Sequence, residues 1–331
     1  MDIDQFAKRI QKYLEKVPLI ILGSGATIPY GLPSMQDLSD FILSNINSED
    51  KEWISFKAKL RGGIDLETAL NQVNLSQDLI KQIIFNTWKL INNKDKKCFR
   101  TILEHTNGIQ LLLSRLLHSH PKEVVIVTTN YDRAVEYCAD KIGAFIITGF
   151  WGTYIGNFKF PYSPFKGNEK TIELIKVHGS IDWFMNEEDI PFVLNSHLDE
   201  IPEDWIPLIV TPGYYKYQET HKDPYRTLIS RSDEQINKAF CYLCIGYGFN
   251  DDHIQPKLLQ EIKNGKPIVV VTKKLTGNGE AIIKENAKKF IVIEEGTDLS
   301  KSMISSSELG NDEVEYNLWE LTNFVKIWLG I

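Results

Sequence analysis

Polar clusters follow apolar runs at several points of the 331-residue sequence, and some contain side chains suited to catalysis. Thr128-Thr-Asn-Tyr-Asp132 carries an amide and a carboxylate, and His178-Gly-Ser180 carries an imidazole. Because an imidazole titrates near neutral pH, His178 is the best candidate for a general base. Taken singly, each residue has a structural explanation, since Asn130 or Asp132 can cap a helix and His178 can be a hydrogen-bonded core residue.

Two glycine-rich clusters could bind a ligand through their backbone N–H groups. Gly23-Ser-Gly-Ala-Thr27 and Gly246-Tyr-Gly248 can present backbone N–H groups to a phosphate. The first is not the common dinucleotide-binding fingerprint, because Ile28 stands where the third glycine belongs. This weakens a dehydrogenase assignment and leaves a purely structural turn as an equal alternative. Asp251-Asp-His253 contains metal-ligand residue types, but adjacent residues rarely face one ion, so we favour helix capping there.

Short apolar runs typical of buried strands alternate with helical patterns. The predicted strands cover 17–22, 123–129, 172–177, 207–210, 240–245, 267–272 and 290–293, and the predicted helices between them cover 131–141, 224–238, 254–264 and 279–289. Continuous apolar runs are typical of strands covered on both faces, so the alternation predicts an α/β fold with a Rossmann-like, doubly wound, mostly parallel sheet. Such folds bind ligands at the carboxyl ends of their strands, where the polar clusters lie.

Residues 34–118 interrupt this alternation with helix signals and almost no strand. We expect a large helical insertion after the first strand, forming a lobe or lid. The serine-bearing segment 300–312 is predicted to be a linker, and 313–329 an amphipathic helix that docks on the core more readily than it forms an oligomer contact. The expected organisation is a catalytic domain over 1–299, followed by a linker and helix over 300–331.

Composition restricts the class of protein. The formal net charge of −7 argues against broad binding to nucleic acid or to an anionic membrane. No apolar run approaches the length of a membrane span and no secretory signal is visible, so we expect a cytoplasmic protein. The four cysteines are too few for a disulfide scaffold. Cys241 and Cys244 alternate along an apolar strand, where we expect free, buried thiols.

The polar clusters, in this order, resemble the sirtuin-like NAD-binding domain over about residues 18–275. The segments that carry the resemblance are Gly23-Ser-Gly-Ala-Thr27, Gly31-Leu-Pro-Ser34, Thr129-Asn-Tyr-Asp132, Val177-His-Gly179 and Gly246-Tyr-Gly248. Two features are more similar to the divergent bacterial branch that acts in anti-phage defence than to the deacetylases. They are the Gly-Tyr-Gly-Phe-x-Asp-x-His form of the last cluster and Asp65-Leu-Glu67 in the helical insertion.

Sirtuin deacetylases carry a zinc ribbon of two C-x-x-C pairs after the His-Gly motif, whereas here no cysteine occurs between His178 and Cys241. The resemblance therefore implies hydrolysis of NAD through an oxocarbenium-like transition state, with water as the nucleophile and no metal. By resemblance, Asn130 would position the water, His178 would act as the general base, and Asp132 would orient the carboxamide of nicotinamide. The NAD-contacting residues that it implies are Gly23, Ser24, Gly25, Ala26, Thr27, Pro33, Thr129, Gly246, Tyr247, Gly248 and Thr272.

The resemblance also implies a biological role. It suggests a toxic effector of bacterial anti-phage defence, acting as a homo-oligomer and gated by assembly with a separate partner such as a HerA-like hexameric ATPase. The alternatives are an NAD-dependent protein deacylase or ADP-ribosyltransferase, and a non-catalytic module that senses NAD or ADP-ribose. The missing ribbon argues against the deacylase, and the presence of both Asn130 and His178 argues against the sensor. The aromatic segments 150–160 and 211–217 are equally consistent with mobile lids and with ordinary surface loops.

Overall fold

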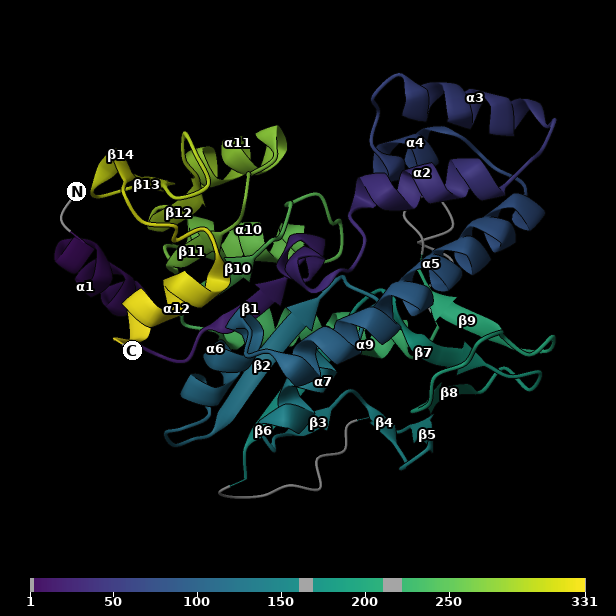
Figure 1. Cartoon of the computed structure of the whole chain (residues 1–331), viewed down its shortest axis with the longest axis horizontal. Helices are drawn as coiled ribbons and strands as arrows, with labels where there is room; N and C mark the ends of the chain where they lie inside the picture. Colours follow the sequence, from purple (N-terminus) through teal and green to yellow (C-terminus); the bar gives the residue numbers. More distant parts are fainter. Residues whose placement is uncertain (1–2, 161–168, 211–221, 331) are drawn as a thin grey trace.

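A mostly parallel sheet forms the centre of the computed structural model, which describes residues 3–160, 169–210 and 222–330 (Figure 1). In spatial order its described strands are β14 (Gly310–Val314), β13 (Ser302–Ser306), β12 (Phe290–Glu295), β11 (Ile268–Val271), β10 (Tyr242–Ile245), β1 (Leu19–Leu22), β2 (Glu123–Thr128), β6 (Thr171–Lys176) and β3 (Phe145–Ile147). All neighbours from β12 to β3 pair in parallel.

Helices cover both faces of this sheet, as the continuous apolar strands predict. In β1 every residue is buried, with Ile20 and Leu22 in one hydrophobic cluster and Leu19 and Ile21 in another. The first cluster includes residues of α1 (Ile3–Tyr13), α6 (Gly108–Leu116), α7 (Ala134–Lys141) and α12 (Leu321–Leu329). The second includes residues of α9 (Tyr225–Lys238), α10 (Gln255–Lys263) and α11 (Gly277–Asn286). The predicted Rossmann-like, doubly wound fold is confirmed.

The segment between β1 and β2 is helical, as expected, but it divides into two parts. Helices α2 (Met35–Asn45), α3 (Lys51–Arg61) and α4 (Leu66–Gln72) share a hydrophobic core of their own with the first half of α5 (Gln77–Glu104). The second half of α5 and α6 pack on the sheet through Cys98, Ile102 and Leu112. In Figure 1 the α2–α4 lobe stands at one end of the long helix α5, which connects it to the sheet.

A second, antiparallel sheet is the main element that the sequence does not predict. Its described strands, in order, are β4 (Phe150–Trp151), β5 (Ile155–Phe158), β8 (Pro191–Leu194), β7 (Gly179–Met185) and β9 (Ile206–Ile209). The assignment of 207–210 to the parallel sheet was wrong, because β9 pairs antiparallel with β7. Nearly every residue of β7 is buried, so β7 lacks the polar alternation that would mark an antiparallel strand.

Gly179 makes the transition between the two sheets possible. Its φ is +87°, and a Cβ atom at this position would lie 1.9 Å from the carbonyl oxygen of Leu208. Only glycine fits such a position. The glycine of the His-Gly motif therefore has a structural explanation that does not involve a ligand.

The C-terminal region differs from its prediction. Residues 300–312 do not form a linker, because β13 and β14 pair as a hairpin that extends the sheet beyond β12. The fully buried hydroxyl of Ser302 anchors the hairpin by donating to Tyr316 O at 2.8 Å and accepting from Leu318 N at 2.7 Å. Helix α12 begins at Leu321 rather than near residue 313, and its buried Phe324 and Trp328 pack in the core.

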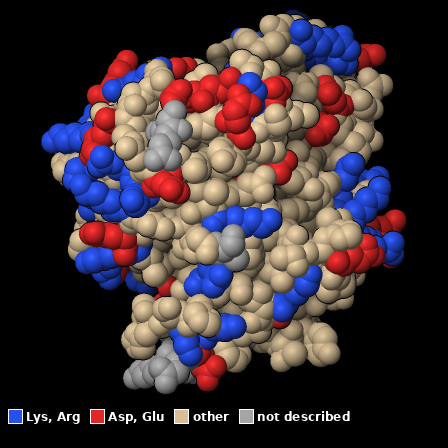
Figure 2. All heavy atoms as spheres, turned by 60° about the vertical axis from the view of Figure 1, so that its left-hand side comes forward, with Lys and Arg blue, Asp and Glu red and all other residues tan. Residues whose placement is uncertain are grey.

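The face of the molecule drawn in Figure 2 carries side chains of both charges. On the face drawn in Figure 2, basic side chains occur in small groups with acidic side chains among them. Within residues 3–160, 169–210 and 222–330, no helix combines the length and apolar character that crossing a membrane requires.

A contact between two glycine-rich turns joins β1 to β10. Gly25 N donates to Gly246 O at 3.1 Å, while Gly246 N donates to Val271 O at 2.9 Å. Gly246 has a φ of +56°, and a Cβ atom there would lie 2.2 Å from Ala26 N. A Cβ atom on Gly23 would likewise lie 2.3 Å from Gly246 O. The turns approach this closely only because none of these three glycines has a side chain.

We therefore expect Gly246→Ala to lower the free energy of unfolding by more than about 2 kcal/mol, because its methyl group meets backbone atoms that have no room to move. Gly248→Ala is the matched control in the same motif, since its Cβ atom would come no closer than 3.6 Å to Thr276 Cγ2. Chemical denaturation of both variants measures the difference. Equal losses in the two variants would contradict this account of the contact.

Candidate active site

One pocket lies at the carboxyl ends of β1, β2, β6 and β10. Its cavity volume is about 170 Å³, below the range of about 300–1,000 Å³ typical of sites that enclose a drug-sized ligand, and the cavity opens to solvent. The sequence-predicted residues that line it are Gly23, Ser24, Thr27, Pro33, Thr129, Asn130, Asp132, His178, Gly246, Tyr247 and Gly248. Segments far apart in the sequence therefore meet here, as the topology of a parallel sheet predicts.

Three predicted NAD-contacting residues do not line this pocket. Gly25 packs against the backbone of Gly246, and Ala26 is buried in the core beneath the turn. Thr272 follows β11, where its N–H donates to Ile293 O at 3.1 Å and its hydroxyl to Lys274 O at 3.4 Å. Thr272 therefore forms its hydrogen bonds near β11 and β12, on the side of β10 that faces away from β2.

The pocket also contains residues that the sequence interpretation did not select. They are Leu32, Ser34, Met35, Leu38, Glu67, Ile91, Tyr131, Asn250 and Asp251. Several of them come from the α2–α4 lobe, so the helical insertion supplies one wall of the pocket. Ser34 also forms a capping box at the start of α2 with Asp37. The resemblance of Asp65-Leu-Glu67 to the defence branch could have indicated Glu67 as a pocket residue. The residue types of this element alone do not indicate a role for it.

Asn130 is held by the turn that follows β1. Its Nδ2 donates to Gly23 O at 3.1 Å and to Thr27 Oγ1 at 3.3 Å, and its backbone N–H donates to Thr128 Oγ1 at 3.0 Å. Its Oδ1 is buried and accepts no hydrogen bond within the described residues. A buried acceptor without a donor is costly, so this oxygen fits a hydroxyl group or water supplied by a ligand.

Asp132 both helps to cap a helix and lines the pocket. Its Oδ1 accepts from Ala134 N at 3.1 Å, which helps to cap α7, and its Oδ2 accepts from Thr27 Oγ1 at 3.1 Å. Burial raises the pKa of Asp132, and the nearby charge of Lys176 opposes this shift. The carboxyl group is therefore fixed in orientation at the edge of the pocket.

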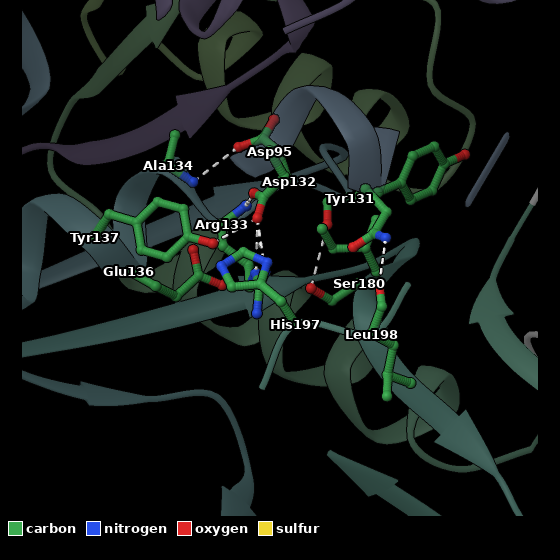
Figure 3. Close-up of polar contacts among 12 residues, drawn as sticks. Asp95, Tyr131, Asp132, Arg133, Ala134, Glu136, Tyr137, Ser180, His197 and Leu198 are labelled. Carbon is green, nitrogen blue, oxygen red and sulfur yellow. Dashed lines mark hydrogen bonds and ion pairs between the residues drawn. The ribbon is translucent and has the colours of Figure 1, made fainter. Parts of the chain in front are cut away.

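Lys176 supports the loop that follows β2 (residues 129–133), which carries Asn130 and Asp132. Its side chain, 1% exposed, donates to Glu136 Oε1 at 2.9 Å, to Ser180 Oγ at 2.7 Å and to the backbone carbonyl of Asp132. Ser180 lies beneath the backbone of Tyr131 and donates to its carbonyl at 3.2 Å (Figure 3). Sequence reasoning missed Lys176, because a lysine at a strand end is usually solvated.

A second ionic cluster holds Arg133, at the end of this loop. Arg133 donates to Asp95 Oδ2 from Nη2 at 2.7 Å and from Nε at 3.1 Å, and Asp95 is fully buried. Figure 3 shows Tyr137 and His197 beside this pair, with the Tyr137 hydroxyl donating to Asp95 and His197 Nδ1 lying 2.9 Å from Arg133 Nη2. Helix α5, helix α7 and the segment after β8 are thereby joined behind the pocket.

His178 projects from the turn between β6 and β7. Its side chain is 7% exposed, and its Nε2 lies 2.8 Å from Asp251 Oδ2. Asp251 Oδ1 accepts from His253 N at 3.0 Å and from Ile254 N at 2.9 Å. The predicted capping therefore acts on the turn that leads into α10, whose own N-cap, Ile254, makes no side-chain hydrogen bond. The general-base candidate and this carboxylate are thus adjacent, although no hydrogen bond joins them.

The four cysteines are free and buried, as predicted for Cys241 and Cys244. Cys241 belongs to the hydrophobic cluster on one face of the sheet and Cys244 to the cluster on the other. The two sulfur atoms therefore point away from each other. Within the described ranges, no group of three or more histidine, cysteine, aspartate or glutamate side chains is arranged to hold a metal ion.

Comparison with known families identifies the chain. A sequence model described as the SIR2-like domain matches residues 124–289, half of the chain, including the Asn130 loop, the His-Gly turn and Gly246. The chain belongs to the SIR2-like family. A search of curated protein sequences finds no match to this SIR2-like protein.

Solved sirtuin structures resemble this SIR2-like chain in fold. A mutant Sir2 homologue in complex with ADP-ribose has a TM-score of 0.50 and 13% identity, covering 87% of this chain and 89% of that one. A sirtuin solved to explain substrate affinity gives 0.49 and 11%, covering 100% and 99%. A Sir2 protein bound to a propionylated peptide gives 0.48 and 12%, covering 98% and 96%.

We expect Lys176→Met to lower the free energy of unfolding by about 3 kcal/mol, at the low end for a buried pair, because it leaves the Glu136 carboxylate, 20% exposed, without its cation. Burial already raises the pKa of Glu136 from 4.5 to about 7, against the opposing charge of Lys176. Loss of the lysine raises this pKa further. The folded variant then binds more protons than the unfolded chain above pH 4.5, so its stability falls as the pH rises.

Urea denaturation of Lys176→Met at about pH 5 and pH 8 measures this effect. The double variant Lys176→Met, Glu136→Gln removes the titrating group and should lose the extra pH dependence. Lys284→Met breaks an exposed pair with Glu280 and should leave the free energy of unfolding nearly unchanged. A cost for Lys176→Met as small as that of Lys284→Met would show that the buried lysine does not support the loop.

Proposed function

We propose that the chain is an NAD hydrolase that releases nicotinamide and ADP-ribose. The observation that carries the proposal is the convergence of Asn130, Asp132 and His178 with the turns at Gly23 and Gly246 in one pocket. Membership of the SIR2-like family supports an NAD-dependent activity. The carboxyl-end position of the pocket is where doubly wound folds bind nucleotides.

Three polar side chains of the pocket would act in this reaction. Asn130 would direct its unpartnered Oδ1 toward the attacking water or a hydroxyl of the nicotinamide ribose, a positioning role. Asp132 would orient the carboxamide of nicotinamide, and His178 would accept the proton of the attacking water. As the nicotinamide–ribose bond breaks, its electron pair leaves with nicotinamide and positive charge develops on the ribose. The nearby carboxylates favour that charge.

The cysteine arrangement favours hydrolysis over deacylation. Deacetylating sirtuins build their peptide cleft against a zinc ribbon, which needs four cysteines around one metal. Here Cys241 and Cys244 lie on opposite faces of the sheet, and Cys98 and Cys138 belong to helices α5 and α7. Without a ribbon to hold an acyl-lysine peptide, water is the available nucleophile.

We further propose that the hydrolase is a toxic effector of bacterial anti-phage defence. Unrestrained hydrolysis would deplete cellular NAD, so the activity needs a gate. Assembly as a homo-oligomer with a separate partner, such as a HerA-like hexameric ATPase, would supply it. The resemblance of the Gly246 cluster and of Asp65-Leu-Glu67 to the defence branch supports this role.

An assay of NAD turnover tests the proposal. We expect the purified chain, alone or with the partner ATPase, to convert NAD into equal amounts of nicotinamide and ADP-ribose. Chromatography measures both products. Asn130→Ala and His178→Ala should each reduce the rate about 10²-fold or more with folding intact, because positioning and proton transfer both act in the transition state. The exposed Asn93→Ala and His105→Ala make the same chemical changes away from the pocket and should retain the rate.

The other outcomes identify the alternatives. Turnover that requires an acyl-lysine peptide would indicate a deacylase, and transfer of ADP-ribose to protein would indicate a transferase. Tight NAD binding without turnover in any assembly state would indicate a sensing module and would overturn the hydrolase proposal. Addition of the partner should change the rate at least several-fold if assembly is the gate.

A further inference from the structure

The pocket at the carboxyl ends of the strands is lined by acidic side chains. Glu67, Asp132 and Asp251 contribute carboxylates to it, whereas none of the described residues that line it is a lysine or an arginine. A cleft lined by charges of one sign attracts a ligand group of the opposite sign. A second feature also points to a ligand, because Asn130 is 8% exposed and its Oδ1 accepts no hydrogen bond within the described residues. The pocket therefore suits a ligand that combines a cationic group with a hydrogen-bond donor.

Two of these three carboxylates already serve the protein. Asp132 uses one oxygen at the start of α7 and the other for the hydroxyl of Thr27. Asp251 uses Oδ1 for two backbone N–H groups of the turn that leads into α10. Both residues are buried, whereas Glu67 is half-buried. Glu67 is therefore the least enclosed of the three and the most accessible to a ligand.

The helical lobe places Glu67 in the wall of the pocket. The Asp65 side chain caps α4 by accepting from Thr68 N at 2.9 Å and from Thr68 Oγ1 at 2.7 Å. Leu66 and Leu70 are buried in the hydrophobic core of the lobe, so Glu67 lies beside this apolar stripe of the helix. The backbone of Glu67 is thus fixed by the lobe, while the residue itself lines the pocket.

The charge of Glu67 reaches the loop that carries the proposed catalytic residues. Tyr131 stands between Asn130 and Asp132 in the sequence, and its ring centroid lies 6.5 Å from that of His178. Burial raises the pKa of Tyr131, and the negative charge of Glu67 raises it further. The lobe therefore contributes negative charge, as well as apolar surface, to the part of the pocket where the nicotinamide ribose is expected.

Oxidised NAD supplies a cation of the right kind, because its nicotinamide ring carries a positive charge and the reduced ring of NADH is neutral. We propose that Glu67 is a specificity-determining residue whose carboxylate pairs with the cationic nicotinamide ring, so that the pocket selects the oxidised nucleotide. This inference rests on the proposed NAD hydrolysis for the identity of the ligand. When the glycosidic bond breaks, the positive charge passes from the ring to the ribose, and the same carboxylate remains close to it.

The expected size of the effect follows from the exposure of Glu67. Solvent screens part of the charge of a half-buried carboxylate. The pair should therefore fall between an exposed ion pair, which changes an equilibrium by about fivefold at most, and a fully desolvated one, whose loss costs far more. We expect the charge of Glu67 to change the affinity for oxidised NAD by about tenfold.

Titration calorimetry with Glu67→Gln tests the inference without turnover. The substitution is made in the His178→Ala variant, so that NAD is not consumed, and it removes the charge while keeping the shape and the helix propensity of the side chain. We expect the Kd for oxidised NAD to rise about tenfold, whereas the Kd for NADH and that for ADP-ribose should stay within about twofold. NADH has the same diphosphate and adenosine, so the comparison isolates the charge of the ring.

Glu52→Gln is the matched control, since it removes the same charge from an exposed position of the same lobe and should leave all three Kd values unchanged. An equal loss of affinity for oxidised NAD and NADH, or a Kd for oxidised NAD within about twofold of that of the parent, would overturn the inference. Selective binding of oxidised NAD without turnover of the wild type in any assembly state would overturn the hydrolase proposal alone. Failure of the wild type to bind NAD would overturn both.

Discussion

The close approach of the Gly23–Gly25 turn to Gly246 is the contact on which the site depends. It brings the loop after β1 and the loop after β10 together at the carboxyl edge of the sheet, with backbone atoms where side chains would otherwise meet. The same turn holds the Nδ2 of Asn130 through Gly23 O. The glycines are thus explained first by packing, and their backbone N–H groups become available to a ligand as a consequence of that packing.

Buried charges fix the rest of the pocket. Lys176 holds the backbone of Asp132, and the Asp95–Arg133 pair holds the residue that follows it. These charges are fully or largely removed from water and are each paired, so breaking one partner is expected to be costly. The loop carrying Asn130 is in this way clamped on two sides before any ligand arrives. Such preorganisation is what a site that positions water requires.

The sequence predicts the parallel sheet and much of the pocket for a clear reason. Continuous apolar strands such as β1 and β11 indicate burial on both faces, and polar residues after them must share one edge. The antiparallel sheet escapes prediction because nearly every residue of β7 is buried. The hairpin of β13 and β14 is hidden by its serines, because a serine-rich segment is typical of a linker. Lys176, Asp95 and the Asp251 contact depend on distant partners, which local patterns do not reveal. Of the segments proposed as lids, 150–160 contributes β4 and β5, whereas 211–217 lies outside the described residues.

The central claim is that this pocket binds NAD with its nicotinamide ribose against Asn130 and His178. A crystal structure of the His178→Ala variant with NAD tests it most directly, because slowed turnover preserves the substrate. The account predicts the diphosphate beside the Gly23 and Gly246 turns and a ribose hydroxyl or ordered water within hydrogen-bond distance of Asn130 Oδ1. NAD bound elsewhere, or bound here with its adenine end at Asn130, would contradict the account.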